Sequence, residues 1–391
     1  MIIRAFATAL VVLSIADPLS GQDAQFRQRV RAGQDAIYRL DYPAAEKIFN
    51  QMKQESPDNP AAYGMLAFAA WHQLLFASRN FALHEYGIPT PFTDEPADLT
   101  VARSERARFV SANDALTQLC DRLLSRNPRD VLALYFKGFA LENLATEAIA
   151  LTKSTWKARG FGDKAKDIHE EVLKLDPSMI DANTSIGVYE YVAATLPWSY
   201  KWLAWLAGVR GDKDVALQRF RDVAAKGTYR AADAQVVMAL LETWKGRSGT
   251  AVSVYTNLHK WYPQSFLIDI GLAVAHERNK DLKSALQVYQ DLLRDLPKKA
   301  PGLQPGEVHF RIGDLYVRLR EYGRALESFD KAVQSAQGDR ETMPLAYYRM
   351  AEIREERGET AQAMDAYRKV LEYSGNALQD EIAHARKKLR K

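Results

Sequence analysis

The stretch ALLETWKGRSGTAVSVYTNLHKWYP, residues 239–263, is matched 34 residues further on by AVAHERNKDLKSALQVYQDLLRDLP, residues 273–297. Both place two small residues, an aromatic residue and a proline at the same spacings of 12, 4 and 8. The matching positions are Ala239, Ala251, Tyr255 and Pro263, then Ala273, Ala285, Tyr289 and Pro297. A fixed period of this length is typical of stacked helical hairpins, so the repeat predicts an α-helical solenoid.

The same pattern recurs in other parts of the chain. The further matches are Gly33, Ala45, Phe49 and Pro57; Gly313, Ala325 and Phe329; and Ala351, Ala363 and Tyr367. Small residues let two helices approach to about 8–10 Å. The aromatic residue lies one turn further along and fills the space against the next repeat. The proline is expected to end the second helix, because it cannot continue the hydrogen-bond ladder.

These residues resemble the tetratricopeptide repeat family. The resemblance covers about residues 26–375 and implies an all-α, right-handed superhelical solenoid of about eight hairpins. Their expected starts are Phe26, Pro60, Val131, Ile180, Ala232, Phe266, Gly306 and Pro344. Repeats two, three and four carry insertions between their two helices. We therefore divide the chain into divergent repeats (22–230), regular repeats (231–375) and a capping helix with a basic tail (376–391).

The first 21 residues have the layout of a secretory signal peptide. A short cationic start is followed by an apolar run, Ala5–Ala16, that is too short to span a bilayer. Cleavage is expected after Ala16 or after Gly21. The sequence thus predicts an exported protein, periplasmic or extracellular, with an association with the cell envelope as a further option. The single Cys120 is expected to be a buried, inert thiol.

Composition and motifs argue against enzymes and nucleic-acid binding proteins. The net charge is +4, with 53 basic and 49 acidic residues spread along the chain, which is not a nucleic-acid footprint. No phosphate-binding glycine loop, Gly-x-Ser-x-Gly turn or His-Glu-x-x-His pair occurs. His169 falls at the aromatic position of its repeat, so packing explains it better than metal binding. We expect no catalytic residues, no metal site and no cofactor.

The family resemblance implies a concave groove lined by the first helix of each repeat. Carried onto this chain, it places apolar and aromatic side chains there, and the protein-binding candidates are Phe68, Trp71, Tyr135, Phe139, Tyr191, Val236, Leu240 and Ile270. The lysine and asparagine residues of carboxylate-clamp repeats are missing at these positions. An exposed apolar groove is either a binding site or is filled by the protein itself, and the insertions make self-filling credible.

The insertion in repeat four carries a tryptophan stripe. Trp198, Trp202 and Trp205 are spaced as one face of a helix over residues 197–209. This stripe packs either into the solenoid or against a membrane or a partner. Residues 187–220 also resemble the tetratricopeptide-repeat-domain-39 group, which is linked to lipid handling.

The sequence therefore predicts an exported scaffold that binds an unidentified protein or peptide through an aromatic groove. The alternative is a peripheral membrane or lipid-associated protein that uses the tryptophan-rich helix and the basic tail.

Overall fold

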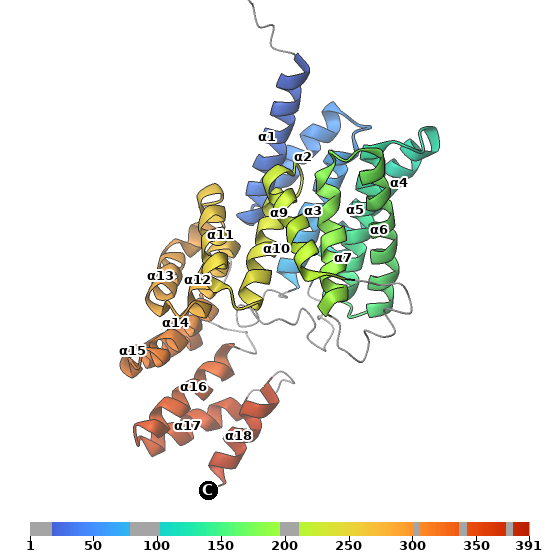
Figure 1. The fold of residues 1–391 in the computed structure, drawn as a ribbon. Helices are drawn as coiled ribbons and strands as arrows, with labels where there is room; N and C mark the ends of the chain where they lie inside the picture. Colours follow the sequence, from blue (N-terminus) through green and yellow to red (C-terminus); the bar gives the residue numbers. More distant parts are fainter. Residues whose placement is uncertain are drawn as a thin grey trace, which may run out of the picture.

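The computed structural model describes residues 18–78, 102–195, 211–299, 305–335, 342–372 and 378–390. Within these ranges the chain forms seventeen α-helices and no strand (Figure 1). The N-terminal helices are α1 (Pro18–Tyr38), α2 (Tyr42–Glu55), α3 (Pro60–Ala77), α4 (Arg103–Arg126), α5 (Val131–Ala150), α6 (Thr155–Leu175), α7 (Asn183–Thr195) and α9 (Lys213–Lys226). A single 3₁₀ turn, η1 (Ile180–Ala182), precedes α7.

The C-terminal helices follow with short connections. They are α10 (Ala231–Trp244), α11 (Ser248–Trp261), α12 (Phe266–Arg278), α13 (Leu282–Lys299), α14 (Gly306–Arg318), α15 (Tyr322–Ser335), α16 (Thr342–Glu356), α17 (Thr360–Leu371) and α18 (Gln379–Leu389). Each helix packs mainly on its neighbours in sequence, which is the arrangement of a solenoid. The predicted all-α solenoid class is confirmed.

Small residues and aromatic rings meet inside each hairpin. A methyl group on Gly33 would lie 2.2 Å from the ring of Phe49, and one on Gly313 would lie 2.6 Å from Phe329. Only glycine leaves room for the ring at these positions. Ala325, at the matching position of the second helix, is fully buried. The spacing seen in the sequence is therefore the spacing of these close contacts.

The prediction that a proline ends the second helix of a repeat is right in one repeat and wrong in the next. Helix α11 ends at Trp261, two residues before Pro263, as predicted. Helix α13, however, continues through Pro297 to Lys299. A proline near the end of a helix removes one backbone donor, but its φ angle still fits the helix, so Pro297 lies in the last turns of α13 instead of ending it.

The insertion in repeat three consists of extra helix instead of a loop. Twelve residues of α5 follow Gly138, whereas five residues of α10 follow the equivalent Ala239. Ten residues of α6 precede Ala165, whereas three residues of α11 precede Ala251. Seven extra residues in each helix lengthen the hairpin by about 10 Å at its turn.

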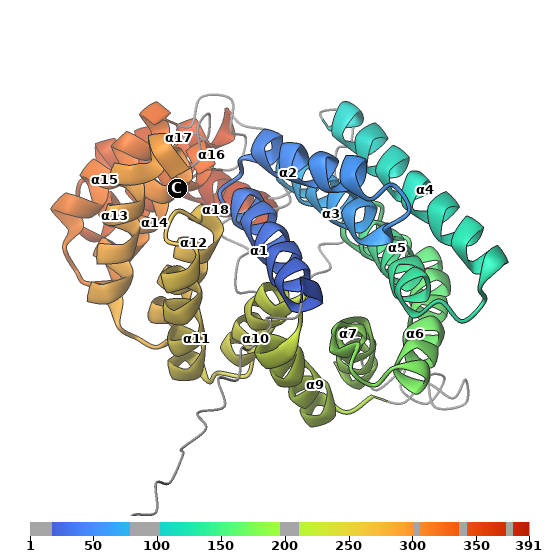
Figure 2. The same cartoon turned by 90° about the horizontal axis from the view of Figure 1, so that it is seen from above.

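The first helix closes the N-terminal half into a ring. Viewed from above, α1 lies beside α10 and α12 (Figure 2), and its contacts there span 195 residues to Asp233 of α10 and 227 to Ser265, just before α12. The Ser265 hydroxyl donates to the carbonyl oxygen of Tyr38 at 2.8 Å. The ring of Tyr38 lies 4.9 Å from that of Tyr262. The superhelix thus closes on its first helix, and α1 covers part of the inner face.

Candidate functional site

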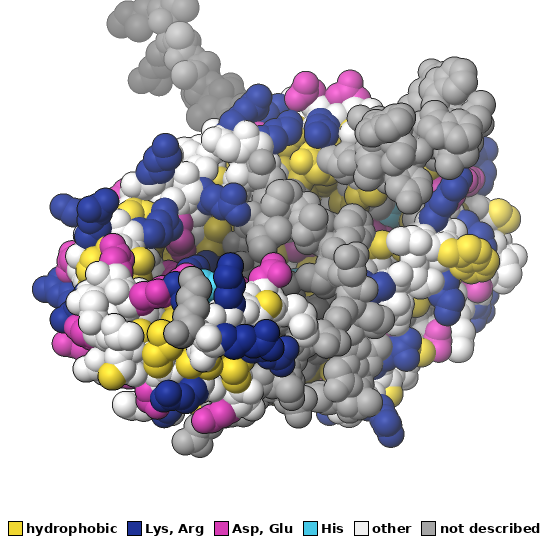
Figure 3. All heavy atoms as spheres, turned by 90° about the horizontal axis from the view of Figure 1, so that it is seen from below, with side chains coloured by type: hydrophobic (Ala, Val, Ile, Leu, Met, Phe, Trp, Pro, Cys, Tyr) yellow, Lys and Arg dark blue, Asp and Glu magenta, His cyan; other side chains and the backbone are white. Residues whose placement is uncertain are grey.

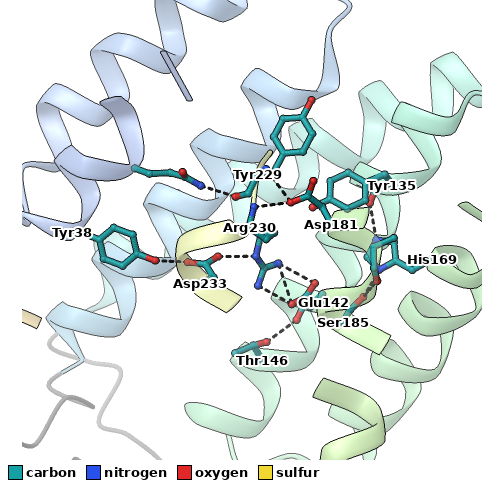
Figure 4. A network of polar contacts seen from close by, with 12 residues as sticks. Tyr38, Tyr135, Glu142, Thr146, His169, Asp181, Ser185, Tyr229, Arg230 and Asp233 are labelled. Atoms are coloured by element: carbon teal, nitrogen blue, oxygen red, sulfur yellow. Dashed lines mark hydrogen bonds and ion pairs between the residues drawn. The ribbon is translucent and has the colours of Figure 1, made fainter. Parts of the chain in front are cut away.

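Arg230 lies at the centre of a buried polar network (Figure 4). It immediately precedes α10, and its guanidinium reaches α5, where it donates to both oxygens of Glu142 at 3.1–3.2 Å. Its Nε donates to Asp233 at 2.6 Å. The side chain of Arg230 is only 11% exposed, and those of Glu142 and Asp233 are 14% and 10% exposed. The three charges are therefore largely withdrawn from water.

Aromatic rings enclose the same guanidinium. Its central carbon lies 5.2 Å from the ring centre of Phe139 and 5.9 Å from that of Phe68. Such cation–π contacts are strongest where water is excluded. Burial disfavours the charged form of Arg230, but the two carboxylates outweigh this and raise its pKa, so it stays protonated.

Asp181, in the 3₁₀ turn η1, holds the backbone just before Arg230. Its carboxylate accepts hydrogen bonds from the backbone amides of Thr228, Tyr229 and Arg230 at 2.8–3.0 Å. Burial raises the pKa of Asp181, and the three amide donors act against that rise. A carboxylate before the start of α10 also suits the positive end of the helix dipole.

Tyr229 fills the space between the first repeats. Its ring lies 5.7 Å from that of Tyr135 and 5.1 Å from that of Phe136. Its backbone carbonyl accepts a hydrogen bond from Gln34 of α1. Segment 228–230 is thus held by repeats one, three and four together.

Two histidines lie at the border of the network. Burial lowers the pKa of His72 to about 4. The negative charge of Asp233 acts against this fall, and the positive charge of Arg230 adds to it. The Tyr38 hydroxyl donates to Asp233, which ties α1 to α10. His169 is buried against the hydroxyl of Ser185 and, through Nε2, against the carbonyl oxygen of Tyr135 at 2.9 Å. Packing therefore accounts for His169, as predicted.

This arrangement holds helices together. The guanidinium of Arg230 is already paired with protein carboxylates, and Ser185, the serine that contacts the ring of His169, is buried together with it. Within the described ranges no group of three His, Cys, Asp or Glu side chains could hold a metal ion. Cys120 is buried, and burial raises its pKa to about 12, so it is an inert thiol.

The predicted groove residues occupy two kinds of environment. Phe68, Trp71, Tyr135, Phe139 and Ile270 are buried, each with 7% or less of its surface exposed, while Tyr191, Val236 and Leu240 are half-buried. Tyr135 packs against Tyr229, and Phe68 and Phe139 lie against the guanidinium of Arg230. Trp71 packs instead on Phe109 of α4. Whether the remaining positions form a protein-binding groove stays a prediction. Trp198, Trp202 and Trp205 lie outside the described residues.

Sequence reasoning missed Arg230, Glu142, Asp233 and Asp181. A signal was present, since Glu142 and Asp233 stand in the first helices of their repeats, where apolar residues dominate. A charged residue on such a face needs a partner. Arg230, two residues before the expected start of repeat five, is the basic residue nearest to Asp233 in the sequence.

A comparison with family models gives the decisive match. Residues 310–377 match a tetratricopeptide repeat model. Tetratricopeptide repeats (TPRs) are therefore present in this chain. The matched residues include α14 to α17, in the part of the TPR solenoid that the sequence marks as regular. No curated protein matches the chain significantly.

Solved structures with a similar course of the chain are TPR proteins and their relatives. YrrB, a TPR protein with an unusual peptide-binding site, is 13% identical, with a TM-score of 0.39 over 56% of this chain and 93% of its own. Yeast Tom70 is 12% identical, with a TM-score of 0.43 over 90% of this chain and 86% of its own. Human IFIT1, solved as a dimer with PPP-AAAA, is 12% identical, with a TM-score of 0.44 over 93% of this chain and 85% of its own. None of the three indicates which partner this chain binds.

Proposed function

We propose that this TPR protein is a protein-interaction scaffold whose partner binds along the first helices of its last two repeats, α14 and α16. The TPR fold suggests a scaffold for protein–protein interaction. Figure 2 shows α12 and α14 on the inner side of the curve, with α13 and α15 outside them. Segment 228–230 fills the inner face of the N-terminal repeats, and residues 266–275 of α12 are buried. The positions open to a partner therefore lie on α14 and α16, which carry the half-exposed Arg318 and Arg349.

The observation that carries this proposal is a series of accessible charges on those helices. Arg318 of α14 pairs with Glu277 of α12 at 2.9 Å, and its side chain is 43% exposed. Arg349 of α16 pairs with Asp314 at 3.3 Å and with Glu352 at 2.9 Å, and its side chain is 42% exposed. Exposed ion pairs are worth little to the fold, so a charged partner segment exchanges them at low cost.

The test is co-purification with the full-length chain. Arg318→Glu together with Arg349→Glu reverses both exposed cations. Arg122→Glu on α4, whose side chain is 53% exposed and pairs with Asp58, is the matched control. A partner retained by the wild type and by the control but lost by the double variant is the expected result, with all three chains equally folded by circular dichroism.

Two outcomes contradict the proposal. If all three chains retain the same partner, the partner binds elsewhere on the molecule. If no protein is retained by the wild type from any fraction of its source cell, the scaffold function itself is wrong.

We also propose that the scaffold is exported, on the basis of the signal-like layout of its first 21 residues. Cleavage after Ala16 leaves α1 whole, and cleavage after Gly21 removes its first four residues. N-terminal sequencing of the protein from a periplasmic or extracellular fraction tests this. A mature protein that still begins at Met1 and stays with the cytoplasmic fraction contradicts export.

A further inference from the structure

An exposed tryptophan stands at the tip of the elongated α5–α6 hairpin. Trp156 lies in the first turn of α6 and is 80% exposed, the largest value among the exposed large hydrophobic side chains of the described chain. Nearby, Gly160 has no atom within 4 Å of the place where a side chain would begin. The ring therefore projects from the solenoid and is not part of its core.

Basic side chains surround this tip. Residues 150–166 carry five lysines or arginines and one aspartate. Lys157 and Arg159, next to Trp156, are exposed. The aspartate is Asp163, which lies one turn after Arg159 at 3.5 Å, and the two side chains are 39% and 60% exposed. The tip thus combines one large aromatic ring with a net positive charge.

The start of α4, beside this tip, also carries basic side chains. Arg106, at the start of α4, pairs with Glu147 near the end of α5 at 2.9 Å, so the start of α4 lies beside the end of α5. Arg103 and Arg108 on the same turns of α4 are exposed. We call Arg103, Arg106, Arg108, Trp156, Lys157 and Arg159 the basic edge.

Figure 3 views the molecule from the side where α5 turns into α6. On its right, over α4 to α6, hydrophobic side chains stand among lysine and arginine side chains. Helix α7 also ends at this side, because it runs antiparallel to α6: His169 contacts Ser185, and Lys166 lies over the ring of Tyr189.

We propose that the basic edge docks on an anionic lipid surface, a role beyond the proposed protein scaffold. A tryptophan flanked by lysine and arginine suits the region between lipid headgroups and acyl chains, where its ring is buried while the cations contact phosphate. A protruding ring without an enclosing pocket fits a fluid bilayer better than a fixed protein partner. Among the described residues no helix is long and apolar enough to cross a membrane.

The test is flotation of the full-length chain with vesicles of phosphatidylcholine, with and without about one third phosphatidylglycerol. The wild type is expected to float with the anionic vesicles only. Each basic residue near such a surface is worth about a fivefold change in binding, so Lys157→Gln with Arg159→Gln should weaken vesicle binding about 25-fold. Trp156→Ala should weaken it about tenfold or more.

Matched controls lie at the opposite edge of the solenoid. Trp261 at the end of α11 is 48% exposed, and Arg126 and Arg129 are exposed where α4 meets α5 at its other end. Trp261→Ala and the Arg126→Gln, Arg129→Gln pair should bind anionic vesicles as the wild type does.

Three results overturn the proposal. One is a wild type that stays in solution with every vesicle composition, which would leave Trp156 as a surface for a protein. Another is equal loss in the control variants, which would indicate general charge attraction. The third is vesicle binding that survives both α6 variants and is lost with Trp202→Ala and Trp205→Ala. None of these outcomes affects the co-purification test of the scaffold function.

Discussion

The two halves of the solenoid use the same repeat but are tied together differently. Where the N-terminal half meets α10, Arg230 and its carboxylates form a buried ionic network that joins helices far apart in the chain. In the C-terminal half, Arg318 and Arg349 form exposed pairs between adjacent first helices. Buried ions are costly to leave unpaired, whereas exposed pairs contribute little. The buried network therefore fixes the shape of the N-terminal half, whereas the C-terminal half keeps its charged side chains available for a partner.

The largest expected effect comes from removing the central cation. Arg230→Met leaves Glu142 and Asp233 buried without their partner, so it should lower the free energy of unfolding by about 3–5 kcal/mol. Arg318→Met is the matched change in the C-terminal half and should cost less than about 1 kcal/mol. Urea unfolding of both variants measures the difference, and equal costs would contradict the contrast between the halves.

The pH dependence of stability should reveal the same network. Unfolded, His72 takes up a proton near pH 6.5, whereas burial holds its pKa in the folded chain at about 4. Its contribution is therefore complete above pH 6.5 and is lost as the pH falls to about 4, by up to about 3 kcal/mol. Unfolding curves at both pH values should show a smaller loss in His72→Gln. The Arg318→Met chain keeps His72 and should keep the full loss.

The sequence predicted contacts that lie within one repeat, but it did not predict those that close the ring. Gly313 and Phe329 meet because their spacing within one hairpin encodes the contact. Arg230 and Glu142 are 88 residues apart, and Tyr38 and Asp233 are 195 apart. Whether such residues meet depends on the small rotation from each repeat to the next, which accumulates along the solenoid. The inner face was therefore expected from the family pattern, while its occupant was not.

Packing inside the hairpins should not distinguish the two halves. Ala45 in α2 and Ala325 in α15 hold the same position of the repeat, and both are fully buried. Replacing either with leucine overpacks a helix crossing and should cost about 1–3 kcal/mol. Thermal unfolding measures both variants. An unchanged melting curve in either variant would count against the alignment of the repeats. A much larger cost at Ala45 would mean that closure of the N-terminal helices by α1 makes their packing less tolerant of added volume.

The smallest expected effect is a gain in stability at the tip of the elongated hairpin. Gly160 lies inside α6 with open space around it, so an added methyl group meets nothing. Alanine favours the helix over glycine, and Gly160→Ala should raise the free energy of unfolding by about 0.5–1 kcal/mol.

Gly138 in α5 of the same hairpin provides the opposite case. A methyl group there would lie 2.5 Å from Nε2 of the buried His169, so Gly138→Ala should destabilise the protein. Measured together by chemical unfolding, the two variants should change stability in opposite directions. A loss of stability in Gly160→Ala would show that the first turns of α6 pack against something in the folded protein, and Trp156 would then be part of the core instead of an exposed edge.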